Sequence, residues 1–235
     1  MVKFSLIIIH LFYGFFEALY ILYVNDKPKK RYIKNWSKRL LSILKIHLEI
    51  NQDLNKILSN NHFLIVSNHI SWLDIFLINS IFPISFLSKG DVERWPLIGK
   101  LTKCADTIYI KRGNKKSLTM ASDQIEKKLN KMDSVYFFPE GFATDGSRLL
   151  PFKSNFFQTA INCNINILPL SIRYTSDGKF SSAPSYAGDI SLPQSMWALI
   201  KVKNLTAHIS VLPVISNKKI ENLLQMKHIR KYIML

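Results

Sequence analysis

An apolar run from Phe4 to Val24, interrupted only by His10 and Glu17, restricts the structures that this chain can adopt more than any other segment does. About 20 residues in a helix that rises about 1.5 Å per residue cover the hydrocarbon core of a bilayer. Cations follow the run at positions 27, 29, 30, 31, 34, 38 and 39, whereas Lys3 alone precedes it. By the positive-inside rule, this asymmetry places the following chain in the cytoplasm. We expect an uncleaved membrane helix that spans the bilayer; the alternative, which the two ionisable residues favour, is a helix buried in the domain or lying in the membrane interface.

The segment from Trp36 to Ile46 predicts a basic amphipathic helix. Its apolar residues recur at helical spacing and are Trp36, Leu40, Ile43 and Leu44. Its cations, which lie outside this apolar stripe, are Lys38, Arg39 and Lys45. Two interpretations stay open. The helix packs on the surface of the domain, or it contacts the membrane a second time through anionic headgroups.

The composition favours a membrane partner over nucleic acid. The formal net charge is +16, although 48% of the residues are hydrophobic. A strong basic excess is typical of proteins that bind nucleic acid, anionic membranes or phosphorylated substrates. No signature of a nucleic-acid-binding module is present, and the aromatic residues fall in apolar runs instead of alternating with Lys and Arg. The two cysteines, Cys104 and Cys163, lack metal-ligand spacing and fit a reducing compartment.

From Phe63 onward, short apolar runs alternate with helical patterns. Candidate strands cover residues 63–67, 84–88, 106–110, 135–138, 165–172 and 208–214, with a helix near 114–132 between the third and fourth. This alternation predicts an α/β domain with a central mixed, largely parallel sheet flanked by helices. We divide the chain into a membrane-anchoring part, residues 1–50, and a globular domain, residues 51–235, whose basic tail from Asn217 we expect to be helical.

A polar break after the first of these strands carries Asn68 and His69, and Asp74 lies five residues after the histidine. A histidine that acts as a general base needs access to a substrate proton and a partner that fixes its tautomer. Five residues on one helix would turn the two side chains about 140° apart, so they meet only if His69 lies in the turn before the helix. The pattern Ser71-x-x-Asp74 predicts such a helix start. It leaves a second interpretation open, in which Asp74 caps a helix and His69 is an ordinary loop residue.

The strand-like run that ends at Pro139 leads into a loop with four candidate substrate-binding residues: Glu140, Gly141, Arg148 and Lys153. Glycine permits a positive φ and close backbone approach, and the cations can hold a phosphate. A further strand end presents Lys111 and Arg112. In both places the alternative is a surface loop whose charges are solvated.

Four segments, in order, resemble the motifs of the glycerolipid acyltransferases that acylate 1-acylglycerol-3-phosphate. The motif N-H-x-x-x-x-D stands at residues 68–74, the second motif at 108–113, F-P-E-G at 138–141, and an apolar strand around proline at 167–170. Any one motif is weak evidence, but four in order over most of the chain are specific. Two departures occur, because Lys111 replaces the acidic residue common before Arg112, and Gly141 is followed by Phe-Ala-Thr instead of Thr-Arg-Ser. The longer third motif is similar to a bacterial branch that includes lyso-ornithine lipid acyltransferases.

The resemblance implies a reaction and roles for the candidate residues. His69 would remove the proton from the free sn-2 hydroxyl of 1-acyl-sn-glycerol 3-phosphate, which attacks the thioester of acyl-CoA or acyl-carrier protein and gives phosphatidic acid. Asp74 would orient His69. The remaining residues would bind substrate: Glu140 and Gly141 at the glycerol and headgroup, and Arg112 at the phosphate with support from Arg148 and Lys153.

The resemblance implies no metal or other cofactor besides the acyl donor. The partners it implies are the lysolipid acceptor, the acyl donor and an anionic membrane surface, with residues 51–235 as the acyltransferase domain at the cytoplasmic face of a bacterial inner membrane. One alternative is acylation of another lysolipid, such as lyso-ornithine lipid. A basic membrane-associated binding protein without activity is the other, against which the retained His69 and Asp74 argue.

Overall fold

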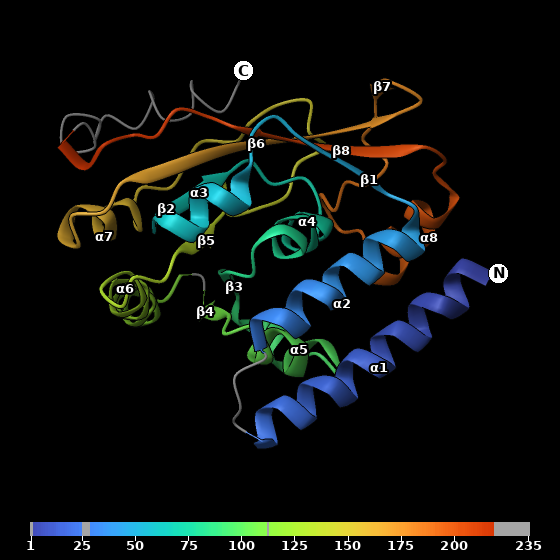
Figure 1. Cartoon of the computed structure of the whole chain (residues 1–235), viewed down its shortest axis with the longest axis horizontal. Coiled ribbons are helices and arrows are strands. Elements are labelled where there is room, and N and C mark those ends of the chain that lie inside the picture. The colour runs from blue at the N-terminus through green and yellow to red at the C-terminus, as the bar shows by residue number, and fades with distance from the viewer. Residues whose placement is uncertain (1, 25–28, 112, 219–235) are drawn as a thin grey trace.

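A computed structural model describes residues 2–24, 29–111 and 113–218 of the chain. Arg112 and the predicted helical tail beyond residue 218 lie outside the described residues. The described strands form a mixed sheet in the order β1-β8-β6-β2-β5-β3-β4, with β7 pairing with β6. The fold is the predicted α/β architecture, with helices packed around this sheet (Figure 1).

The strands run over His47–Ile50 (β1), Leu64–Ser67 (β2), Ser85–Lys89 (β3), Ile108–Ile110 (β4), Val135–Phe137 (β5), Ile167–Ser176 (β6), Lys179–Phe180 (β7) and Leu205–Val211 (β8). β8 and β7 run antiparallel to β6, whereas the other pairs are parallel. The helices are α1 (Val2–Val24), α2 (Lys29–Leu44), α3 (Leu54–Asn60), α4 (Leu73–Ile81), η1 (Gly90–Arg94), α5 (Ile98–Cys104), α6 (Lys115–Leu129), α7 (Phe157–Asn162) and α8 (Leu192–Lys201).

Each strand predicted from residue 63 onward is present with shifted ends, whereas β1 and the two-residue β7 were missed. The four residues of β1 alternate between half-buried and exposed side chains, and His47 and Glu49 give it no apolar run. β1 nevertheless pairs with β8, so the last residues of the expected anchoring part belong to the sheet. The pairing, and not the local sequence, makes this segment a strand.

β2 lies at the centre of the sheet and is buried on both faces. Because side chains alternate along a strand, Leu64 and Val66 join one hydrophobic cluster and Ile65 joins the other. Helix α6 covers the first face, and α4 covers the second. Strands β2, β5 and β6 are parallel, so their carboxyl ends meet at one edge of the sheet, where ligands bind in open α/β folds.

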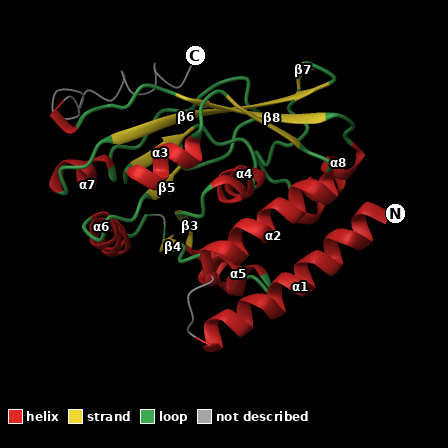
Figure 2. Cartoon of the chain, viewed as in Figure 1, coloured by secondary structure: helices red, strands yellow, loops and turns green. Residues whose placement is uncertain are grey.

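Helices α4, α2 and α1 lie in succession away from the sheet (Figure 2). One side of α1 is buried against the domain, through Ile7, His10, Gly14, Ala18 and Ile21. A Cβ at Gly14 would lie 2.2 Å from Nε1 of Trp36, so only glycine permits this approach of α1 and α2. α1 is long and apolar enough to cross a membrane by length and composition.

The two ionisable residues of the apolar run both have partners in the domain. Glu17 Oε2 lies 2.8 Å from Nη2 of Arg39, and the His10 ring stacks on Trp36 with centroids 4.9 Å apart. The opposite side of α1 exposes large apolar and aromatic side chains, among them Ile9, Phe12, Phe16, Tyr20 and Tyr23. The polar residues of the run therefore do not oppose contact between this outer face and lipid.

We predict that Ile125→Ala lowers the free energy of unfolding by about 2–5 kcal/mol, because it opens a cavity under α6. Ile125 is fully buried against β2 and β5. Met120→Ala, on the same helix but 54% exposed, is the matched control and changes stability by about 0.5 kcal/mol or less. Chemical denaturation in detergent measures both; equal losses would contradict the packing described.

Candidate active site

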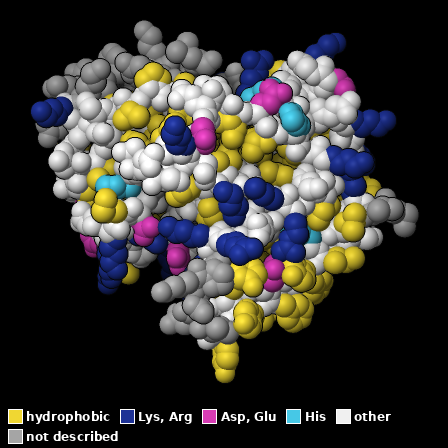
Figure 3. Space-filling model, viewed as in Figure 1, with side chains coloured by type: hydrophobic (Ala, Val, Ile, Leu, Met, Phe, Trp, Pro, Cys, Tyr) yellow, Lys and Arg dark blue, Asp and Glu magenta, His cyan; other side chains and the backbone are white. Residues whose placement is uncertain are grey.

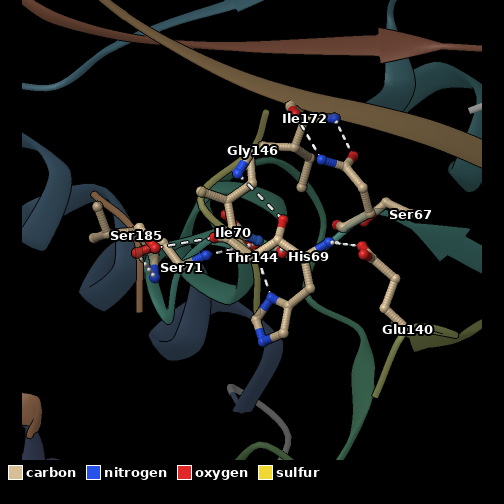
Figure 4. A network of polar contacts seen from close by, with 12 residues as sticks. Ser67, His69, Ile70, Ser71, Glu140, Thr144, Gly146, Ile172 and Ser185 are labelled. Atoms are coloured by element: carbon tan, nitrogen blue, oxygen red, sulfur yellow. Dashed lines mark hydrogen bonds and ion pairs between the residues drawn. The ribbon is translucent and has the colours of Figure 1, made fainter. Parts of the chain in front are cut away.

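The loop after β2 begins with Asn68, whose buried side chain continues the strand pairing that the backbone ends. Its Nδ2 donates to Ile172 O at 2.8 Å, and its Oδ1 accepts from Ile172 N at 2.7 Å. The side-chain amide thereby replaces one residue of the parallel ladder to β6 (Figure 4). This pair fixes where the loop leaves the sheet.

His69 lies in the turn before α4, and Asp74 lies in the first turn of that helix. Nδ1 of His69 is 2.9 Å from Asp74 Oδ2. A carboxylate only accepts hydrogen bonds, so Nδ1 donates and Nε2 is the unprotonated nitrogen of the neutral ring. The two side chains meet as the five-residue spacing predicted.

The helix start differs in detail from the predicted cap. The Asp74 carboxylate turns back over the loop and accepts from the backbone N–H groups of Ile70 and Ser71, at 2.8 and 3.0 Å. Its other oxygen, Oδ1, accepts from the Tyr174 hydroxyl at 2.7 Å. The carboxylate is fully buried, and its hydrogen bonds replace the water that a buried charge loses.

The His69 side chain is 18% exposed and stacks on Phe138, with ring centroids 3.8 Å apart and planes at 12°. Figure 4 shows the ring below the polar network, with its second nitrogen pointing away from it. Phe138 and Asp74 therefore fix the plane and the rotation of the ring. The arrangement presents a neutral Nε2 that can accept a proton from a bound hydroxyl.

Glu140 follows β5 and connects two loops. Its Oε1 accepts from His69 N at 2.8 Å, and its Oε2 accepts from Leu150 N at 2.7 Å. Burial raises the pKa of Glu140, and the two backbone donors act in the opposite direction. We expected this side chain to position the glycerol and headgroup of a substrate; in the structure its two oxygens hold backbone N–H groups on either side of the site.

Two further loops hold the backbone around His69. Thr144 N donates to His69 O at 2.8 Å, and Tyr186 N donates to Ile70 O at 2.8 Å. Ser185 Oγ donates to Thr144 O at 3.0 Å, which joins the two loops to each other. The polar backbone of the His69 turn is thus satisfied by segments far away in the sequence.

The loop cations predicted to bind substrate occupy different positions. Lys153 lies against Gly141, which has φ +74° and at which a Cβ would be 2.8 Å from the Lys153 ammonium. The same ammonium lies 5.0 Å from the centroid of the Phe142 ring. Arg148 is exposed farther along the loop, and Arg112 lies outside the described residues. Among these three cations, the structure places only Lys153 beside the turn that carries Phe138 and Glu140.

Several residues that complete the site could not be recognised from local sequence patterns. Tyr174, Thr144 and Tyr186 lie 75 to 116 positions from the residues they contact, as in the Tyr174 bond to Asp74 across 100 residues. A tyrosine within the apolar run of β6 signals only that its hydroxyl needs a partner once it is buried.

Comparisons with known proteins bear on this site. The family model described as Acyltransferase matches residues 45–173. A 1-acyl-sn-glycerol-3-phosphate acyltransferase of Neisseria gonorrhoeae is 34% identical over 77% of this chain and 70% of its own length. A lyso-ornithine lipid O-acyltransferase of Pseudomonas aeruginosa is 28% identical over 82% of this chain and 73% of its own length. The crystal structure of the 1-acyl-sn-glycerophosphate acyltransferase PlsC from Thermotoga maritima superposes with a TM-score of 0.70 at 19% identity, covering 98% of this chain and 90% of that one.

We predict that Glu140→Gln lowers the free energy of unfolding by about 1.5–3 kcal/mol, because an amide cannot accept from both backbone N–H groups. Thermal or chemical unfolding measures the loss. Glu126→Gln is the control, since Glu126 accepts one exposed hydrogen bond from Asn162. A Glu140→Gln protein as stable as the parent would show that Glu140 does not brace the two loops.

Proposed function

Because the chain belongs to the acyltransferase family, with 1-acyl-sn-glycerol-3-phosphate and lyso-ornithine lipid acyltransferases among its relatives, we propose that it acylates 1-acyl-sn-glycerol 3-phosphate. The acyl chain comes from acyl-CoA or acyl-carrier protein, the acceptor is the free sn-2 hydroxyl, and the product is phosphatidic acid. The observation that carries the proposal is the His69 ring, fixed by Asp74 and Phe138 with Nε2 available to a substrate.

In the proposed reaction, Nε2 of His69 takes the proton of the sn-2 hydroxyl as its oxygen attacks the thioester carbon. The tetrahedral intermediate collapses by breaking the carbon–sulfur bond, and the thiolate takes the proton back from the imidazolium. Asp74 stabilises the imidazolium through Nδ1. The thioester is already reactive, so the reaction requires no covalent acyl-enzyme. Glu140 acts on the reaction by holding the backbone of His69.

We assign the nearest phosphate contact to Lys153, with Arg148 and Arg112 as the supporting cations. Lys153 is exposed at the edge of the loop, and its ammonium is held against Gly141 and the Phe142 ring. A lysine ammonium is a compact positive charge with three donors, which suits a phosphate oxygen. Gly141 contributes by leaving room for this ammonium.

We infer that α1 lies along the membrane surface instead of leaving the domain to span it. Figure 3 shows hydrophobic side chains gathered over α1 and, beside them, Lys and Arg side chains gathered over α2. The exposed cations of α2 include Lys30, Arg31 and Lys38. An apolar helix face beside a row of cations matches acyl chains beside anionic headgroups. A site held at this surface reaches a lysolipid without extracting it fully.

A cavity between α1, α2, α4 and α5 offers room for part of an acyl chain. Its lining is mostly apolar and includes Ile75, Phe76, Ile98 and Leu101. Ile75 and Phe76 belong to the helix that begins just after His69. An acyl chain that enters this cavity would lie between the proposed membrane face and the catalytic turn.

The second candidate acceptor is lyso-ornithine lipid. The Pseudomonas aeruginosa relative supports it, and so does the extended loop between Gly141 and Lys153, which resembles that branch. Purified protein offered each acceptor with acyl-CoA and with acyl-carrier protein separately would identify the pair that reacts. Product from lyso-ornithine lipid alone would overturn the first choice of acceptor and retain the proposed chemistry.

We predict that His69→Ala lowers turnover by about 10²–10⁴-fold, because the general base is lost. Binding to anionic vesicles is expected to stay unchanged, since α1 and α2 are intact. His62→Ala, which removes a partly buried histidine before β2, is the control and keeps normal turnover. Full activity in His69→Ala would exclude this mechanism.

We predict that Lys153→Ala raises KM for lysophosphatidic acid about tenfold, the loss of roughly one charged contact. KM for lyso-ornithine lipid, where that substrate reacts, changes less because it lacks the phosphate. Lys127→Ala, at the exposed end of α6, serves as the control for lost surface charge. Unchanged kinetics in Lys153→Ala would move phosphate recognition to Arg112 or Arg148.

A further inference from the structure

The Asp74 carboxylate distributes its hydrogen bonds unevenly between its oxygens. Oδ2 faces His69 Nδ1, Ile70 N and Ser71 N, whereas Oδ1 has a single donor among the described residues, the Tyr174 hydroxyl at 2.7 Å. Without that hydroxyl, a fully buried and charged oxygen would lack a hydrogen bond. Tyr174 therefore fixes the rotation of the carboxylate that in turn orients His69.

The Tyr174 hydroxyl acts as a hydrogen-bond donor. Its side chain is completely buried on β6, and both burial and the adjacent Asp74 charge raise the pKa of its hydroxyl well above the ordinary value. The hydroxyl consequently keeps its proton throughout the pH range in which an enzyme works. A hydrogen bond from it disperses part of the negative charge of Asp74.

The ionisable groups that face this pair come from every neighbouring element. They are His69 in the turn before α4, Tyr136 on β5, whose hydroxyl donates to Ser67 Oγ at 2.6 Å, and Glu140 after β5. Burial also raises the pKa of Tyr136, which stays neutral. Glu140 contacts the His69 backbone and not the Asp74 carboxylate. Tyr174 is thus the side chain that can adjust the charge Asp74 presents to His69.

We propose that Tyr174 is a positioning residue that, by hydrogen-bonding Asp74 Oδ1, holds the carboxylate in the orientation in which Asp74 Oδ2 accepts from His69 Nδ1 and leaves Nε2 free to accept a proton. The inference rests on the proposed function insofar as His69 is the base. It concerns the proton equilibrium of His69 and can be measured without the reaction.

The expected direction of the shift in the His69 proton equilibrium follows from how the negative charge of Asp74 is distributed between its two oxygens. In Tyr174→Phe, the carboxylate keeps more of its charge on Oδ2 and holds the His69 imidazolium more strongly. In Tyr174→Phe, neutral His69 with a free Nε2 therefore forms only at higher pH. Loss of one hydrogen bond to a charged group corresponds to an upward shift of about one pH unit.

The first experiment measures kcat/KM against pH for the parent and Tyr174→Phe, using lysophosphatidic acid and acyl-CoA. We expect the acid limb to move up by about one pH unit, while KM changes less than about twofold because Tyr174 does not reach the substrate. Tyr136→Phe is the matched control. It removes an equally buried hydroxyl that donates to Ser67, so it costs stability without moving the limb.

The second experiment follows the His69 ring itself by NMR in histidine-labelled protein, with its signal assigned by its absence in His69→Gln. The titration midpoint of His69 is expected to rise by about one unit in Tyr174→Phe. Incorporation of 3-fluorotyrosine at position 174, which makes the hydroxyl a stronger donor, should shift the midpoint in the opposite direction. This near-isosteric variant also provides the test if Tyr174→Phe does not fold.

The outcomes separate the two proposals. A parent protein that does not acylate lysophosphatidic acid contradicts the proposed function, and the His69 midpoint still decides the role of Tyr174. An unchanged midpoint in the folded variants, or a loss of activity that is equal at every pH, overturns the inference. Opposite shifts with phenylalanine and 3-fluorotyrosine support it, because a purely structural role predicts neither sign.

Discussion

The site depends on one fully buried negative charge, the Asp74 carboxylate. A charge removed from water is tolerated only where hydrogen bonds replace its hydration. The loop supplies two backbone N–H groups, His69 supplies one ring N–H, and β6 supplies the Tyr174 hydroxyl. The turn between β2 and α4 therefore folds around the Asp74 carboxylate, and this arrangement determines the position of His69.

The α/β architecture, the predicted strands and the meeting of His69 with Asp74 could be derived from the sequence. Each depends on patterns within about ten residues, such as the apolar run of β2 or the five-residue spacing. The contacts of Glu140, Thr144 and Tyr174 could not be derived, because they depend on which strand lies beside β2 and in which register. β1 was missed for the same reason, since its partner β8 lies more than 150 residues later.

Helix α1 shows a similar division between what the local sequence tells and what depends on distant segments. Length and composition identified α1 as a helix suited to lipid, while His10 and Glu17 left a helix buried in the domain or lying in the membrane interface as the alternative. The structure separates two sides of the helix, and both ionisable residues lie on the side that packs against the domain. The position of α2, held closely at Gly14, shows that this side packs against the domain.

The ion pair between Glu17 and Arg39 has a consequence for how the two helices can be separated. The two residues lie 22 positions apart, and their contact joins α1 to α2. A fragment that contained α1 without α2 would carry Glu17 as an uncompensated carboxylate in an otherwise apolar segment. The pair of helices is therefore the smallest unit of this segment in which that carboxylate has its cation.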